Sequence, residues 1–380
     1  MHIPDGYLSP LTCATLYAGA APFWAIALRR VKRALHTRLV PLLSLFSAFC
    51  FVVMMFNLPL PGGTTAHALG VGVSAIVLGP WASVLAVSTA LLIQAVFFGD
   101  GGITALGANC FNMAIVGSLV AYGAYRALAG RAPLLAARRV IAAGVAGYVA
   151  INAAALCAAI EFGVQPYFFH DAGGAPLYAP YPLRIAVPAM MIGHLTFAGM
   201  AELILSSGIV RWLQHSNPAL LLATAPGART AEMPEPYPAP EPARLEPPPS
   251  PPATRSLWLG LAALLLLTPL GIRAVGAAWG EWSARDLASP QARRQIAAAS
   301  GHQLPPARVP GGLQRLSSLW TAPFPGYAPP IVRSQSFGYL LSALFGAGLI
   351  VLAGAIVGRL AASTRRKLRS INSVADGQFQ

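Results

Sequence analysis

The chain has 380 residues, of which 56% are apolar and only 10% are charged, and its formal net charge is +14. Soluble domains average about a quarter charged residues, so this composition excludes a water-soluble enzyme and also a disordered or fibrous chain. An excess of basic residues suits nucleic-acid binding, but it suits equally a membrane protein whose basic residues hold its cytoplasmic ends. The four cysteines lie in apolar stretches without CxxC spacing, which indicates buried hydrophobes rather than disulfides or a zinc site.

The apolar pattern predicts an all-α polytopic membrane protein, because a helix needs roughly 20 apolar residues to cross the bilayer. Suitable runs cover residues 7–28, 39–57, 81–98, 103–127, 138–160, 185–210, 256–276 and 336–360. Basic clusters lie at 29–38, 126–139 and 359–369, and the positive-inside rule places all three in the cytoplasm only if the short, Gly-rich segment 64–79 also crosses or nearly crosses. We therefore expect nine crossings, with the N-terminus outside and the C-terminus in the cytoplasm.

The crossings divide into two modules. Residues 1–213 form an expected seven-helix membrane module, and residues 214–255 form a cytoplasmic linker whose stretch 226–252 is too rich in proline to bury a core. Residues 256–360 form a two-helix module with a polar extracytoplasmic loop at about 277–335, in which 284–300 is expected to contain a short helix. A basic cytoplasmic tail, 361–380, completes the chain.

The first candidate ligands are Met1 and His2. Only MHIPDG precedes the first apolar run, without the basic start of a signal peptide, so we expect an unprocessed Met1 with a free amine on the extracytoplasmic face. That amine, the backbone nitrogen of His2 and its imidazole Nδ1 can close two adjacent chelate rings on one metal. A fourth nitrogen would complete the tetragonal nitrogen set that suits Ni(II) or Cu(II). The alternative is that His2 is an exposed, mobile terminal residue.

A second candidate is His67, in the string GGTTAHALGVG at the expected outer mouth of segment 64–79. The small residues around it allow irregular backbone and close helix approach. An ionisable residue at such a depth is by default a functional candidate. A helix-capping or interfacial histidine is the alternative.

Polar residues recur at the outer start of another span, in DGGITALGANCFN. Asp100, Thr104, Asn109 and Asn112 there are candidates for orienting a metal-bound histidine or closing over it, while helix capping and interhelical hydrogen bonds are the alternative. The loop expected at 161–183 carries Glu161, His170 and Asp171, which we interpret as part of a surface lid rather than as a metal set.

His194 and Glu202 are eight residues apart, so they share one helix face. A proton relay is one interpretation of this pair, but the other helices supply no continuous polar chain. Packing and interhelical hydrogen bonds are therefore the favoured role. The sequence contains no phosphate-binding loop, HExxH, GxSxG or kinase motif set, so energy for any transport must come from a gradient or from another subunit.

Three blocks of the first module resemble the substrate-binding S component of energy-coupling-factor transporters for nickel and cobalt. They are MHIPDGYLSP at the start, the block at residues 62–122, and GHLTFAGMAELI at residues 193–204. The resemblance implies a seven-helix fold with the N-terminus inserted into the bundle. It also implies a divalent ion held by the amine of Met1, the backbone nitrogen and imidazole of His2, and the imidazole of His67. Candidates for supporting or covering these ligands are Asp5, Thr65, Asp100 and Asn109.

The second module, at VPGGLQRLSSLWTAPFPGYAPP, resembles the auxiliary two-helix subunit of nickel and cobalt systems. That family usually has acidic residues where this chain has Gly311 and Gln314, which weakens any cation-gathering role for this motif. The chain also lacks the proline that many cobalt-type members have after the mouth histidine, since it continues His67-Ala68. This difference, like the square-planar nitrogen set, favours nickel over cobalt.

The resemblance implies a metal-recognising component, not an enzyme, that works with a transmembrane coupling subunit and two cytoplasmic ATPase subunits in the cell (inner) membrane, with no nucleic acid. Ni²⁺ or Co²⁺ is then its cargo, and affinity is expected to fall below about pH 6.5 because the ligands must be neutral. The alternatives are a gradient-driven secondary metal transporter and a membrane sensor, suggested by the tail RRKLRSINSVADGQFQ.

Overall fold

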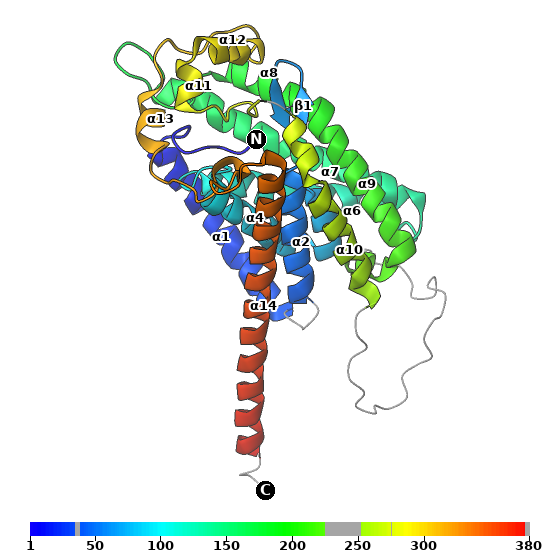
Figure 1. Ribbon diagram of the computed structural model, residues 1–380. Helices are drawn as coiled ribbons and strands as arrows, with labels where there is room; N and C mark the ends of the chain where they lie inside the picture. The colour runs from blue at the N-terminus through cyan, green and yellow to red at the C-terminus, as the bar shows by residue number, and fades with distance from the viewer. Residues whose placement is uncertain (35–38, 225–251, 275, 377–380) are drawn as a thin grey trace.

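The computed structural model describes residues 1–34, 39–224, 252–274 and 276–376, and these residues form a helical bundle from which the C-terminal helix projects (Figure 1). Seven of the described helical stretches are long and apolar enough to cross a membrane. They are α1 (Pro10–Ala34); α4 (Pro80–Ile93) with the π-helical η1 (Gln94–Phe98); α5 (Leu106–Asn109) with η2 (Cys110–Val116) and α6 (Gly117–Ala129); α7 (Ala137–Phe168); α8 (Leu183–Gly193) with η3 (His194–Ala198) and α9 (Gly199–Ser216); α10 (Pro252–Leu267) with η6 (Thr268–Arg273); and α14 (Gln335–Asp376).

Two shorter apolar helices, α2 (Leu39–Met54) and α3 (Val71–Leu78), fall in the other two predicted segments. The all-α membrane fold is thus confirmed, and each expected span contains a helix, although segment 64–79 is helical only from Val71 and begins with strand and irregular chain. The eight residues of α3 rise only about 12 Å, so α3 alone is too short to cross. The crossing of segment 64–79 and the orientation of the termini stay predictions.

Helices of the first module approach one another closely where small residues meet. Gly147 on α7 packs on Ser206 of α9, and a Cβ at this glycine would overlap the serine hydroxyl. A short hairpin of β1 (Leu58–Leu60) and antiparallel β2 (Thr64–Ala66) precedes α3, and a 3₁₀ turn, η4 (Pro218–Thr224), follows α9. The hairpin carries the chain into the segment that contains His67.

The second module packs on the first through α14 and α10, which lie beside α2 (Figure 1). Gly346 of α14 sits against the ring of Phe51, where a larger residue would overlap the ring. The connecting loop lies over the end of the bundle that holds the N-terminus. It contains α11 (Ala284–Ala288), α12 (Pro290–Ala298), α13 (Gly311–Leu316) and the 3₁₀ turn η7 (Pro325–Tyr327).

Two details of the sequence prediction need correction. The single short helix expected at 284–300 is two helices, because Ser289 and Pro290 end one helix and begin the next, with proline at the first helical position. Glu161 is not in a loop, because α7 continues to Phe168. The proline-rich stretch 226–252 lies, apart from its last residue, outside the described residues, as do residues 377–380 of the tail.

Candidate metal-binding site

The N-terminal segment is folded into the bundle rather than exposed. The backbone N–H of Ile3 donates to Asn109 Oδ1 at 2.8 Å, and Ile3 O accepts from Asn109 Nδ2 at 3.1 Å and from Gly102 N–H at 2.8 Å. The carboxylate of Asp5 accepts from the N–H groups of Ile103 and Thr104 and from the Thr104 hydroxyl. The block at 100–112 therefore holds residues 3–5 through backbone and side-chain hydrogen bonds.

His67 is positioned by a carboxylate from another helix. Glu202 of α9, fully buried, accepts hydrogen bonds from the N–H groups of Leu69, Gly70 and Gly72 at 2.8, 2.9 and 3.1 Å. These bonds satisfy the free N–H groups at the start of α3, where the dipole of the helix also favours a negative charge. The favoured structural role of Glu202 thus takes the form of a clamp on the segment that follows His67.

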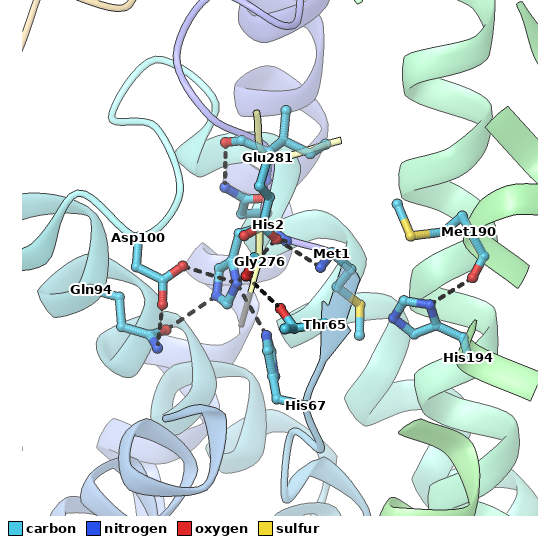
Figure 2. Close-up of polar contacts among 12 residues, drawn as sticks. Met1, His2, Thr65, His67, Gln94, Asp100, Met190, His194, Gly276 and Glu281 are labelled. Carbon is cyan, nitrogen blue, oxygen red and sulfur yellow. Dashed lines mark hydrogen bonds and ion pairs between the residues drawn. The ribbon is translucent and has the colours of Figure 1, made fainter. Parts of the chain in front are cut away.

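The tautomer of His67 follows from its partners. Its Nδ1 lies 3.0 Å from the carbonyl oxygen of Ala68, which only accepts, so Nδ1 carries the proton and Nε2 carries the free lone pair. Burial, reinforced by the nearby His2, holds the pKa of this imidazole well below its ordinary value, which keeps the ring neutral. Nε2 faces His2 Nδ1 at 3.3 Å (Figure 2).

The tautomer of His2 is fixed by Gln94 at the start of η1. Gln94 Nε2 donates to Asp100 Oδ2 at 3.4 Å, so its Oε1 is the atom 3.3 Å from His2 Nε2 and accepts the proton of that nitrogen. His2 Nδ1 then presents its lone pair to His67 Nε2, with Asp100 Oδ1 3.3 Å away. Two lone pairs facing each other across 3.3 Å repel, and a cation bound by both would relieve that repulsion.

A carboxylate from the second module contacts the same group of nitrogens. Glu281 Oε1 lies 2.9 Å from the Met1 amine, 2.9 Å from the backbone nitrogen of His2 and 4.0 Å from His2 Nδ1 (Figure 2). Ligand atoms of His2, Asp100 and Glu281 all lie within 4.8 Å of one another. The side chains of Met1, His2 and His67 are buried, with 5% exposure or less.

The second module also supplies a tyrosine to this network. The hydroxyl of Tyr327 in η7 donates to Asp100 Oδ2 at 2.6 Å and lies 3.1 Å from Gln94 Nε2, which donates to it. Burial, with the charge of Asp100, raises the pKa of Tyr327 well above its ordinary value, so the phenol keeps its proton. Tyr327 thereby fixes the two residues that contact the His2 ring.

The remaining predicted residues are placed less directly. Thr65 donates to Gly276 O at 3.5 Å and so ties β2 to the loop of the second module, through which Thr65 also pairs with Ala278 in a parallel bridge. His194 donates from Nδ1 to Met190 O at 2.8 Å, within its own helix, and with Met1 it lines a cavity of about 750 Å³. His194 and Glu202 thus bond to different partners, which argues against a relay between them. The interhelical hydrogen bond expected of His194 is instead a bond within its own helix.

Glu161, His170 and Asp171 do not come together. Glu161 accepts from Asn112 Nδ2 at 2.8 Å between two helices, which gives Asn112 its interhelical role. His170 and Asp171 lie in an exposed turn, where Asp171 Oδ1 accepts from the N–H groups of Gly173 and Ala175. The bonds of this turn are local, and they do not connect it to the site.

Sequence reasoning missed Glu281, Gln94 and Tyr327. The available signal was that Glu281, one of only 12 acidic residues, stands between tryptophans in the string AAWGEW. An isolated acid in an aromatic setting is unusual enough to single out.

The family of the cobalt uptake substrate-specific transmembrane region matches residues 2–220, more than half of the chain. The chain belongs to this family. A second family, the PDGLE domain, matches residues 254–363, which comprise the second module. Both matches agree with the resemblances seen in the sequence.

Relatives of the family extend the match to the whole chain. The fused nickel transport protein NikMN of Rhodobacter capsulatus is 55% identical over 96% of this chain and 99% of its own length. The probable fused nickel transport protein LarMN of Lactiplantibacillus plantarum is 41% identical over 78% and 82%. A crystal structure of a truncated transition metal transporter, 50% identical, covers 56% of this chain and 98% of its own, with a TM-score of 0.53.

These relatives are named as transport proteins, and the chain is accordingly a multi-pass transport protein of the cell membrane and not an enzyme.

Proposed function

We propose that the chain is the metal-recognising component of a nickel (or cobalt) uptake transporter, and that it binds the ion at its outer face. Four nitrogens serve as ligands: the Met1 amine, the backbone nitrogen and Nδ1 of His2, and Nε2 of His67. The observation that carries this proposal is the lone pair of His67 Nε2 directed at His2 Nδ1 across 3.3 Å, next to a buried amine.

Nickel is the favoured ion. Binding through a backbone nitrogen requires that nitrogen to lose its proton, and the resulting chelate places three nitrogens in one plane. A square-planar nitrogen set suits Ni(II) better than Co(II). The two fused relatives are named nickel transport proteins, whereas the matching family is named for cobalt.

The test is nickel binding to the purified full-length protein. His67→Ala, and separately one residue inserted between Met1 and His2, should each lower affinity by at least about a hundredfold, because each removes one or more ligands. His170→Ala is the matched control, because His170 is a histidine in an exposed turn away from the site. Full affinity in the insertion variant would rule out the terminal chelate, and metal analysis of the purified protein would identify the ion.

Transport itself is proposed to be driven by ATP through separate subunits, a transmembrane coupling component and two cytoplasmic ATPases. The absence of a phosphate-binding loop from this sequence supports that division of labour. Cells that express the chain without ATPase partners should take up little nickel. Strong uptake driven by a proton or sodium gradient would instead establish the secondary transporter.

The two modules have proposed roles of their own. Residues 1–213 hold the ion, and residues 256–360 act as an accessory module whose loop at 277–335 reaches the site. The contacts of Glu281 with Met1 and His2, and of Tyr327 with Asp100, support this assignment. Residues 214–255 join the modules as the linker.

A further inference from the structure

Glu281 and a metal ion compete for the same place. The single proton on the backbone nitrogen of His2 points to Glu281 Oε1, 2.9 Å away. A metal bound to that nitrogen replaces the proton, which is released to solvent, and lies on the same side. An ion held in line between nitrogen and oxygen needs about 4 Å, twice a usual metal–nitrogen bond length. The gap of 2.9 Å is too short, and the gap from the Met1 amine to the same oxygen is equally short.

The backbone around Glu281 is fixed, so its side chain is the part that moves. The Tyr7 hydroxyl donates to Trp282 O at 2.7 Å, and the N–H of Glu281 donates to Ala278 O at 3.0 Å. The side chain of Glu281 is 20% exposed, and it lines a cavity of about 270 Å³ together with Asp5, Asp100 and Trp282. The carboxylate therefore has space to leave the nitrogens without displacement of the loop.

The segment that carries the chelating nitrogens has support other than Glu281. Residues 3–5 are held by Asn109, Gly102 and Thr104 through hydrogen bonds that do not involve the second module. Loss of the Glu281 carboxylate therefore removes a competitor for the nitrogens but not the support of the N-terminal segment.

We propose that Glu281 is a placeholder, a carboxylate of the accessory module that occupies the nitrogen ligands of the empty site and swings aside when the ion arrives. This inference rests on the proposed nickel site. Departure of Glu281 breaks the contacts that the Met1 amine and the His2 N–H make with the second module. The contacts of the second module therefore differ between the empty and the filled site.

The first experiment follows Glu281 in the unmodified full chain. Carboxylates are labelled with a carbodiimide and an amine, with and without saturating Ni²⁺, and labelling is read by mass spectrometry at Glu281 and Asp286. Asp286 is the matched control, because it lies in the same loop and caps α11 through Ser283. We expect labelling of Glu281 to rise with nickel and that of Asp286 to stay constant. Unchanged or reduced labelling of Glu281 overturns the proposal, and reduced labelling would identify a metal ligand.

The second experiment measures association of Ni²⁺ with purified variants. Glu281→Ala should bind nickel about tenfold faster, because charge-assisted hydrogen bonds no longer have to break. Asp286→Asn, which removes one negative charge from the loop without touching the nitrogens, should leave the rate within about twofold. Equal or slower association in Glu281→Ala overturns the placeholder.

The two proposals fail in different ways. If the unmodified protein binds no nickel, or if His67→Ala binds it fully, the proposed function is wrong. If His67→Ala loses binding while Glu281 labelling does not rise, only the placeholder is wrong.

Discussion

The carboxylate of Glu202 accepts a hydrogen bond of 2.8 Å from the backbone N–H of Leu69, which lies two residues after His67, the histidine that faces His2. The bond joins α9 to the segment before α3 and is one of three that Glu202 makes there. The orientation of His67 thus depends on a residue 135 positions later in the chain.

Glu202→Gln should weaken nickel binding by about tenfold or more, because an amide offers fewer acceptor sites to three N–H donors, and bonds to charged groups are worth about 1.5–3 kcal/mol each. Nickel titration measures the effect. Glu161→Gln is the matched control, since Glu161 is another glutamate on a membrane helix, but its carboxylate accepts from Asn112 instead of from the backbone around α3. A Glu202 variant that loses thermal stability as the control does, with unchanged affinity, would contradict a positioning role.

Tyr327→Phe removes the hydroxyl that fixes Asp100 and Gln94, the two residues in contact with the His2 ring. The variant loses two hydrogen bonds, one of them to a carboxylate, which predicts a nickel affinity lowered at least about fivefold. Tyr339→Phe is the comparison, because the Tyr339 hydroxyl donates to Met55 O instead of to a residue that contacts His2. Equal nickel affinity in the Tyr327 variant and the unmodified protein would show that the second module does not order His2.

Nickel affinity should depend on pH in two ranges. Nickel binding releases the His2 amide proton and also a proton from the Met1 ammonium, so affinity should fall by at least about tenfold for each unit by which the pH is lowered, even near pH 8. A proton competes for His67 only near or below the pKa of that imidazole, which burial and His2 hold below the ordinary value. The additional loss at His67 therefore begins at a lower pH than the value of about 6.5 expected for an unperturbed histidine. Dissociation constants measured from about pH 8 to pH 5 test both parts, and a flat profile above pH 7 would exclude the amide ligand.

Gly102→Ala should displace the N-terminal segment, because a Cβ on Gly102 would overlap the backbone nitrogen of Asp5. Backbone atoms cannot yield as a flexible side chain can, so we expect nickel affinity to fall at least about tenfold. Gly123→Ala on α6 serves as the control, since among the described residues no neighbouring element comes within 4 Å of the position that its Cβ would take. Normal affinity in Gly102→Ala would mean that the position of Asp5 is unimportant for binding.

The helices and the three proposed ligand residues could be predicted from the sequence because each signal is local. Hydrophobic runs mark the helices, and Met1, His2 and His67 have donor atoms suited to a transition metal. The residues that contact these three could not be predicted in this way. Asp100 was expected near a ligand, but Gln94 and Glu281 contact His2 only because distant segments pack together, and no local pattern encodes that packing.

Asp5 and Glu202 show a second limit of prediction from the sequence. Both were noted in the sequence, yet their work is to hold backbone N–H groups, which every residue except proline carries. Because any such residue can donate its backbone N–H, the sequence around the donors does not reveal which side chain accepts from them. The π-helical turn η3, which begins at His194 and precedes Glu202, could likewise not be predicted from a helical period of 3.6 residues.

The ion pair between Met1 and Glu281 joins residues 280 positions apart. At synthesis rates of about 5–20 residues per second, roughly 14–56 s pass between the synthesis of Met1 and that of Glu281. During that interval the proposed chelating nitrogens exist without their carboxylate partner. A growing chain whose first helices are already packed is therefore open to metal before the accessory module has been synthesised.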